Sequence, residues 1–217
     1  MSTEEDLIRY YSARAPEYEE IYEKAERQRD LGRLRRALTE LTTGERVLEL
    51  ACGTGYWTRV MARSATEVHA VDASRESIEV ARRRGTPGDR VTFEVADLEV
   101  LDVHLYTRSM VVAGFLWSHI PLQEIDDFLD RLAVRLGPGT RAVFFDNRYV
   151  EGSSTPVSHR DRYGNSYQQR RLASGESFSI VKNFPSPSDL ANAARRVGSE
   201  VRLVELEYFW LLQFRFG

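Results

Sequence analysis

The apolar positions of the chain fall into two alternating patterns, short continuous runs and longer stripes with helical spacing. A leucine stripe over residues 31–41 predicts a helix that ends at Gly44, and residues 46–50 follow as a short buried strand. The other predicted strands of this part are 68–71, 91–95, 110–113 and 142–145, and the other predicted helices are 57–65, 74–85 and 121–136. Strands that alternate with helices predict βαβ units and a parallel sheet.

The pattern changes between residues 149 and 185. Two strand-like stretches, 167–172 and 177–182, flank a four-residue turn and predict a β-hairpin. A last helix over 189–197 and two strands over 201–208 and 210–216 are expected to follow. Residues 1–30 are rich in tyrosine and charge, and fit a helical cap. The chain thus divides into a lid (1–30), a core (31–148), an insertion over the substrate site (149–185) and a C-terminal part (186–217).

Length and composition set broad limits. The chain has 217 residues, which favours one α/β domain over two. No apolar run approaches the roughly 18 residues of a membrane span, so no membrane partner is expected. The acidic N-terminus and the lone Cys52 favour a reducing cytoplasm. The net charge of -3 argues against nucleic acid as a partner. A monomer or a homodimer is expected.

A glycine-containing turn follows the first predicted strand. That strand ends at Glu49, and the turn contains Ala51, Gly53 and Gly55 before the next helix begins. Small residues between a strand and a helix let a ligand approach backbone amides closely. Because any tight turn needs such residues, the turn alone does not identify a ligand.

Two carboxylates follow the next two predicted strands. Asp72 ends the second strand, where an acidic side chain can accept both ribose hydroxyls of an adenosine, or can serve as a helix cap. Asp97 ends the third strand beside Leu98, where it can accept from an adenine amine. Because these strand ends meet at one edge of a parallel sheet, they predict one adenosine-binding site.

The motifs at residues 47–55, 71–74 and 95–98 together resemble those of class I S-adenosylmethionine-dependent methyltransferases of the small-molecule type. The resemblance covers about residues 45–150 and implies a Rossmann-like seven-stranded sheet with an antiparallel last strand. It also implies S-adenosylmethionine as cofactor and S-adenosylhomocysteine as product. The glycine turn would hold the methionine part, Asp72 the ribose, and Asp97 with Leu98 the adenine. Ala51 replaces the family's usual first glycine, and Glu49 suits the cationic ammonium group.

The remaining site predictions concern the lid and the turn after the fourth strand. Residues 10–18 resemble the N-terminal lid of small-molecule methyltransferases. The predicted cofactor contacts are Tyr11, Tyr18, Glu49, Ala51, Gly53, Gly55, Asp72, Ala73, Asp97, Leu98 and Phe115. The predicted acceptor contacts are Tyr10, Trp57, Trp117, Arg148 and Tyr149. His119 can titrate near neutrality, and is either the catalytic base or a residue that orders the turn before Pro121.

Other chemistries find less support. Asp146 and Asn147 resemble part of the magnesium site of catechol-type methyltransferases, but the partner aspartate after the fourth strand is missing, so no metal is predicted. A nicotinamide-binding domain would have glycine in place of Thr58. We therefore expect transfer of a methyl group to an oxygen or nitrogen of a small metabolite. The alternatives are a non-catalytic module that binds the same cofactor and, after it, an NAD-dependent oxidoreductase.

Overall fold

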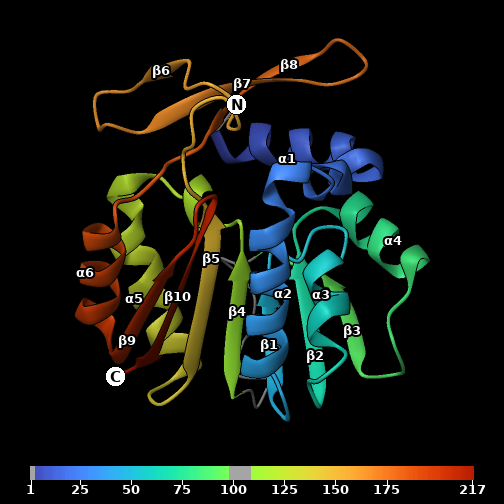
Figure 1. The fold of residues 1–217 in the computed structure, drawn as a ribbon, viewed down its shortest axis with the longest axis vertical. Helices are drawn as coiled ribbons and strands as arrows, with labels where there is room; N and C mark the ends of the chain where they lie inside the picture. The colour runs from blue at the N-terminus through green and yellow to red at the C-terminus, as the bar shows by residue number, and fades with distance from the viewer. Residues whose placement is uncertain (1–2, 98–108) are drawn as a thin grey trace.

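A seven-stranded sheet forms the centre of the molecule. The structure is a computed structural model, which describes residues 3–97 and 109–217. The strands lie in the order β3-β2-β1-β4-β5-β10-β9, and β10 alone runs antiparallel to its two neighbours (Figure 1). Their bounds are Arg46–Leu50 (β1), Glu67–Asp72 (β2), Val91–Val95 (β3), Met110–Gly114 (β4), Arg141–Asn147 (β5), Gly198–Glu205 (β9) and Phe209–Phe216 (β10). The predicted fold class, a mixed sheet with an antiparallel last strand, is confirmed.

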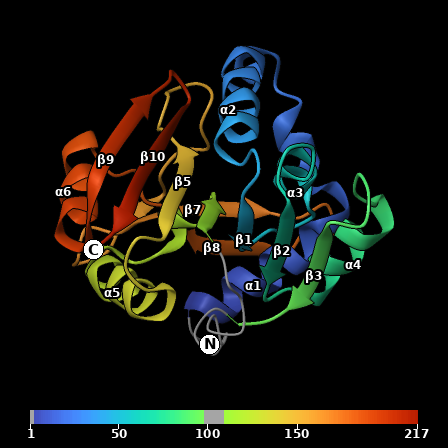
Figure 2. The ribbon, with the colours of Figure 1, turned by 90° about the horizontal axis from the view of Figure 1, so that it is seen from below.

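Helices cover both faces of this sheet, as Figure 2 shows. On one face lie α2 (Gln28–Leu41), α3 (Tyr56–Met61) and α4 (Arg75–Arg84), and on the other lie α5 (Ile125–Leu136) and α6 (Pro187–Val197). Phe144 and Phe145, consecutive residues of β5, are both at most 1% exposed because one faces each helical layer. Burial of such a side chain contributes about 2 kcal/mol to stability. Because the central strands are covered on both faces, successive side chains are all buried, and the strands consist of continuous apolar runs.

Side-chain caps mark the N-terminal ends of α4 and α6. The Ser74 hydroxyl accepts a hydrogen bond from the backbone N–H of Ser77 at 3.0 Å, which caps α4 as predicted. Helix α6 begins at Pro187, two residues earlier than predicted, because Ser186 and Asp189 form a capping box. Helix α3 ends at Met61 and is shorter than predicted.

The N-terminal segment and the insertion lie together over the carboxyl ends of the parallel strands (Figure 1). The segment consists of α1 (Thr3–Arg14) and two 3-10 helices, η1 (Ala15–Tyr22) and η2 (Ala25–Arg27). The insertion is a second, three-stranded sheet of β6 (His159–Arg160), β7 (Ser166–Arg171) and β8 (Ser177–Val181). The predicted hairpin is β7 and β8, while the two exposed residues of β6 carry no apolar pattern and were not predicted.

Short 3-10 helices complete the connections. η4 (Trp117–His119) follows β4, and η5 (Leu122–Glu124) precedes α5, so the helix predicted from Pro121 begins with a 3-10 turn. Among the described residues, no helix is both long enough and apolar enough to cross a bilayer.

Candidate functional site

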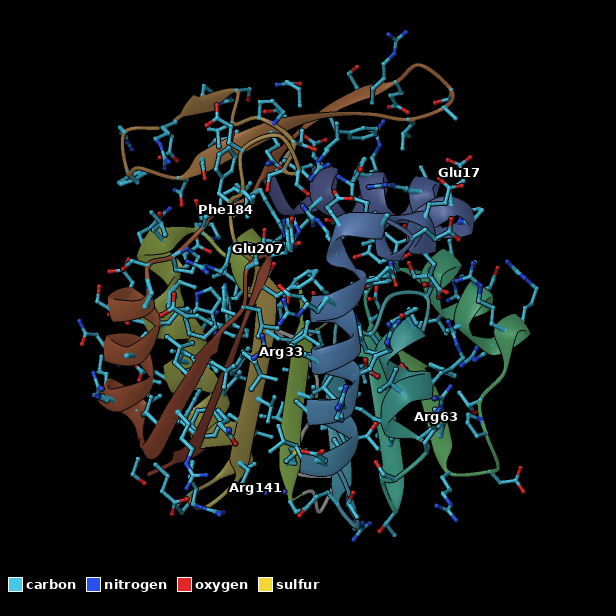
Figure 3. The ribbon with its side chains drawn as sticks, viewed as in Figure 1. Glu17, Arg33, Arg63, Arg141, Phe184 and Glu207 are labelled. Atoms are coloured by element: carbon cyan, nitrogen blue, oxygen red, sulfur yellow. The ribbon has the colours of Figure 1, made fainter. Side chains whose placement is uncertain are left out.

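A cavity of about 540 Å³ lies between the carboxyl ends of the parallel strands, α1 and the three-stranded sheet. Figure 3 shows side chains from all these elements filling the surrounding space, with Phe184 below the three-stranded sheet. Nine predicted site residues line the cavity: Tyr11, Tyr18, Ala51, Gly53, Asp72, Ala73, Asp97, Phe115 and His119. The fold therefore brings the glycine turn, two carboxylates and the histidine to a single space.

The glycine turn presents its backbone to this cavity. Ala51 and Gly53 both have positive φ, 53° and 55°, which bends the chain sharply after β1. A Cβ atom added at Gly53 would meet nothing within 4 Å, so its outer side is open. An alanine in the left-handed region costs roughly 1 kcal/mol, and strain of this kind is concentrated at ligand-binding sites.

Asp72 is held in place by the turn that it faces. Its Oδ2 accepts the N–H of Gly53 and its Oδ1 accepts the N–H of Ser74, both at 2.8 Å. Burial raises the pKa of Asp72, and the two backbone N–H groups oppose that rise. Each oxygen keeps a lone pair toward the cavity, which fits two ribose hydroxyls. Asp97 is exposed on the same cavity, whereas Leu98 lies outside the described residues.

Glu49 lies behind the glycine turn and not on the cavity wall. The residue is 3% exposed, and its Oε2 accepts a hydrogen bond from the Thr58 hydroxyl at 2.5 Å. Burial raises the pKa of Glu49 to about 8. Thr58, which stands where a nicotinamide-binding motif would have glycine, thus provides the hydrogen bond that the buried carboxyl group of Glu49 needs. Direct contact of Glu49 with a cofactor ammonium group stays a prediction.

The stability of the protein without ligand should therefore fall as pH rises toward 8. Between the ordinary pKa of 4.5 and the folded value of about 8, the folded state keeps a proton on Glu49 that the unfolded state has lost. Replacing Glu49 with glutamine should remove this loss and leave the variant more stable at pH 8 by about 2–4 kcal/mol, the advantage vanishing near pH 4.5. Urea unfolding of both proteins from pH 4.5 to 8 measures the difference. Parallel stability curves would contradict the assignment.

An ion-pair cluster fastens the N-terminal segment to the glycine turn. Glu19 of η1 accepts two hydrogen bonds from the Arg59 guanidinium, at 2.7 and 2.8 Å, and also pairs with Arg84. The hydroxyl of Thr54, inside the turn, donates to the same carboxylate at 2.8 Å. These contacts hold η1 over α3 and α4, so Tyr18 remains on the cavity wall.

Tyr11 and His119 form a hydrogen-bonded pair on the cavity wall. The Tyr11 hydroxyl lies 2.8 Å from His119 Nε2, and His119 Nδ1 lies 2.6 Å from the carbonyl oxygen of Val181. Burial, followed by the positive charge of Lys182, lowers the pKa of His119 to about 3. Burial also raises the pKa of Tyr11 well above 10. Both side chains are thus neutral near pH 7.

A buried ion pair packs behind this histidine. Asp146 is fully buried, and its Oδ1 lies 3.1 Å from Lys182 Nζ. Its Oδ2 accepts from both the N–H and the hydroxyl of Ser118, at 3.0 and 2.7 Å. The charge of Lys182 holds the pKa of Asp146 below its usual range, against the effect of burial. The described residues contain no cluster of three potential metal ligands.

Three predicted acceptor contacts belong to the core. Tyr10 is buried beside Phe178, and its hydroxyl accepts from Arg14. Trp57 is 4% exposed within the cluster that includes α2 and α3, while Trp117 packs in the cluster of the opposite face. None of the three lines the cavity. Aromatic density in the sequence does not separate core from pocket, because both environments favour large apolar surfaces.

Arg148, Tyr149 and Gly55 also lie away from the cavity wall. The Arg148 guanidinium donates to the carbonyl oxygen of Leu206 at 2.5 Å and so ties β5 to the β9–β10 turn. The ring of Tyr149 packs edge-on against Phe184 with centroids 5.3 Å apart. Gly55, with φ of 76°, is the N-cap of α3. Their predicted roles as ligand contacts gain no support from this placement.

Phe115 occupies a strained position where β4 meets the cavity. Its φ of 60° is unusual for a bulky residue, and its N–H donates to the carbonyl oxygen of Phe145 at 2.8 Å. No residue with a side chain fits at the preceding Gly114, because an added Cβ would lie 2.3 Å from the Phe145 ring. This chain turn directs the backbone after β4 along the cavity wall.

Several lining residues were missed by the sequence analysis. Helix α1 contributes Leu7 and Ile8, and the insertion contributes polar residues: Asp161, Tyr163, Asn165 and Tyr167. Lys182, which is buried but does not line the cavity, carried a usable signal, because it follows β8 in the same alternating series of buried positions as Phe178 and Ile180. The residues of the insertion loop carried none, since turn-forming and ligand-binding polar residues look alike in a sequence.

Comparison with known proteins agrees with this geometry. A family model described as a methyltransferase domain matches residues 47–139. A demethylmenaquinone methyltransferase from Clavibacter sepedonicus is 38% identical over 114 residues, which are 52% of this chain and 44% of that protein. A ubiquinone biosynthesis O-methyltransferase from Bordetella avium (strain 197N) is 27% identical over 72% of this chain and 63% of its own length. The chain thus spans between about two fifths and two thirds of the length of these curated relatives.

The solved structures extend the likeness to the whole chain. DhpI in complex with SAM and HEP is 30% identical, with a TM-score of 0.76, and the match covers 99% of both chains. DhpI in complex with SAH matches 98% of this chain with a TM-score of 0.72. With a confirmed fold, a glycine turn beside Asp72 on one cavity and a full-length relative at this identity, the chain belongs to the class I S-adenosylmethionine-dependent methyltransferases.

Proposed function

We propose that this chain transfers the methyl group of S-adenosylmethionine to an oxygen or nitrogen atom of a small metabolite bound in the cavity. The observation that carries the proposal is the continuity of that cavity. Its wall runs from Gly53, Asp72 and Asp97 to the pair of Tyr11 and His119. A donor bound at the first group of residues and an acceptor bound at the second would share one cavity.

The donor end fits an adenosine with a methionine tail. Asp72 offers carboxylate oxygens for the ribose, and the open side of Gly53 leaves room for the tail. The exposed Asp97, after β3, offers a carboxylate to the amino group of the adenine, while Phe115, after β4, lines the same cavity farther along the strand ends. S-adenosylmethionine supplies an electrophilic methyl on a sulfonium, which an aromatic wall stabilises without hydrogen bonds.

The acceptor end suits in-line displacement. The chain's task is to align the nucleophile with the methyl group and to exclude water, which the lid and the three-stranded sheet do by closing over the strand ends. Tyr11, Tyr18 and His119 enclose this end. The curated relatives include an O-methyltransferase of ubiquinone biosynthesis, which favours an oxygen nucleophile in this chain as well.

A direct assay tests the proposal. The purified protein is incubated with S-adenosylmethionine carrying a labelled methyl group and with pools of hydroquinones, catechols, hydroxy acids and amino alcohols. Formation of S-adenosylhomocysteine together with a labelled product supports the function. Tight binding of S-adenosylmethionine without turnover of any pool would favour the binding module, and binding of NADH in its place would favour the oxidoreductase.

Removing the histidine should separate binding from turnover. His119→Ala deletes a side chain at the acceptor end but none of the donor contacts, so kcat should fall about 100-fold or more while the Kd for S-adenosylmethionine changes less than threefold. Calorimetry gives the Kd and the labelled assay gives kcat. Val134→Ala, which shortens a side chain of α5 that is 78% exposed and away from the cavity wall, is the control and should change neither value. Loss of cofactor binding in His119→Ala would contradict this assignment.

A further inference from the structure

The protons of the Tyr11–His119 pair can be placed from the hydrogen-bond partners. The carbonyl oxygen of Val181 only accepts hydrogen bonds, so His119 Nδ1, 2.6 Å away, must carry a proton. A neutral imidazole then has an unprotonated Nε2, and the Tyr11 hydroxyl must donate to it across 2.8 Å. The chain of donors therefore runs from Tyr11 through the ring to the backbone of β8.

This direction leaves Nε2 unable to take a second hydrogen bond from the cavity. Its single lone pair is already used by Tyr11, whereas the Tyr11 oxygen keeps lone pairs of its own. Within residues 3–97 and 109–217, the Tyr11 hydroxyl has no hydrogen-bond partner besides His119. Of these two side chains, Tyr11 is therefore the one whose oxygen is free to accept a proton from a bound alcohol or amine.

We propose that Tyr11 is a catalytic residue that relays the proton of the methyl acceptor to His119. This inference rests on the proposed function. The acceptor atom forms its bond to the methyl carbon while the carbon–sulfur bond of the donor breaks and the electron pair stays on sulfur. The acceptor's proton passes to the Tyr11 oxygen as the tyrosine's own proton passes to His119 Nε2. The positive charge lost from sulfur reappears on the imidazolium ring, so atoms and charge balance.

Two groups beside the ring, Asp146 and the carbonyl of Val181, favour a cation that forms during turnover. The carboxylate of Asp146 lies close enough to favour a charged His119, and it is fully buried, so its attraction is weakly screened. The carbonyl of Val181 accepts the Nδ1 proton throughout and keeps the ring orientation fixed. Burial, the largest effect, acts in the opposite direction together with Lys182 and Arg170, and keeps the resting ring neutral. The ring thus begins neutral beside a carboxylate that can share its later charge.

A double-mutant cycle tests the relay. We compare Tyr11→Phe, His119→Gln and the double variant, using the acceptor that the unaltered protein methylates fastest in the pools described above. Because the two side chains act in series, each variant should lose about 100-fold in kcat and the double variant no more than either single one. The Kd for S-adenosylmethionine should stay within threefold in all three. Tyr208→Phe, a tyrosine away from the cavity wall, is the matched control and should retain full kcat.

Nitrogen NMR of histidine-labelled protein adds a measurement that does not depend on turnover. The His119 signals, assigned by their loss in His119→Gln, should show a protonated Nδ1 and an unprotonated Nε2, and Tyr11→Phe should shift Nε2 most. A proton on Nε2, a kcat of Tyr11→Phe within threefold of normal, or losses that multiply in the double variant would overturn the relay alone. No turnover of any acceptor by the unaltered protein would overturn the proposed function and the relay together.

Discussion

Replacing Asp72 with alanine should weaken the binding of S-adenosylmethionine about 100-fold. In the proposed function this carboxylate accepts two ribose hydroxyls, and it also holds the N–H groups of Gly53 and Ser74 at 2.8 Å. Hydrogen bonds to a charged group contribute about 1.5–3 kcal/mol each, so a net loss of about 3 kcal/mol is a conservative expectation. Titration calorimetry with S-adenosylmethionine measures the change.

Asp89→Ala is the matched control for this prediction. Asp89 is an exposed aspartate in the loop before β3 and away from the cavity wall, so its removal should leave the Kd unchanged. A thermal melt of each variant separates loss of the site from loss of the fold. A well-folded Asp72→Ala protein that binds S-adenosylmethionine with normal affinity would refute the assignment of this carboxylate to the donor.

Breaking the buried ion pair should produce the largest loss of stability. Lys182→Met removes the cation 3.1 Å from Asp146 and leaves a fully buried carboxylate whose remaining described partners are neutral. Removing one partner of a buried pair costs about 3–5 kcal/mol, which corresponds to a decrease of roughly 10 °C in the melting temperature of a chain this long. Differential scanning calorimetry without ligand gives the value.

The double variant Asp146→Asn with Lys182→Met distinguishes charge from packing. Asparagine keeps a carbonyl oxygen for the Ser118 N–H and hydroxyl, while neither side chain is charged, so most of the lost stability should return. The exposed pair of Arg46 and Glu67, 3.1 Å apart, provides a comparison, since Arg46→Met should cost less than about 1 kcal/mol. Equal losses at the buried and exposed pairs would contradict this account.

The sequence was sufficient to predict the central sheet and the meeting of the glycine turn with the residues that follow β2 and β3. Strands β1 and β3 have the predicted bounds. Strand β1 is a short stretch whose last four residues are buried, and β3, at the edge of the sheet, alternates apolar and polar residues. The convergence of Gly53, Asp72 and Asp97 on one cavity was predictable because the carboxyl ends of parallel strands meet at one edge. Gly53 and Asp72, 19 positions apart, are hydrogen-bonded for this reason.

The acceptor end was harder to predict, because its walls come from segments whose contacts are set by tertiary packing. Tyr11 and His119 are separated by 108 positions and meet only when α1 folds over the strand ends. Trp57 and Trp117 face the two apolar layers of the sheet and not the cavity, a choice that depends on helix orientation. The pairing of Asp146 with Lys182 joins β5 to the end of β8, and neither sequence neighbourhood indicates the other.

Helix α1 covers the cavity and also forms part of its wall. Leu7, Ile8 and Tyr11 all belong to α1, whereas the seven strands of the central sheet begin only at Arg46. A chain shortened by its first fourteen residues would therefore keep a complete sheet and both donor carboxylates while admitting bulk water to the reaction space. Turnover should then depend on the N-terminal segment more strongly than the binding of the donor does, and Ser12, hydrogen-bonded to Ser74 at 2.8 Å, is the contact through which α1 reaches the residues beside Asp72.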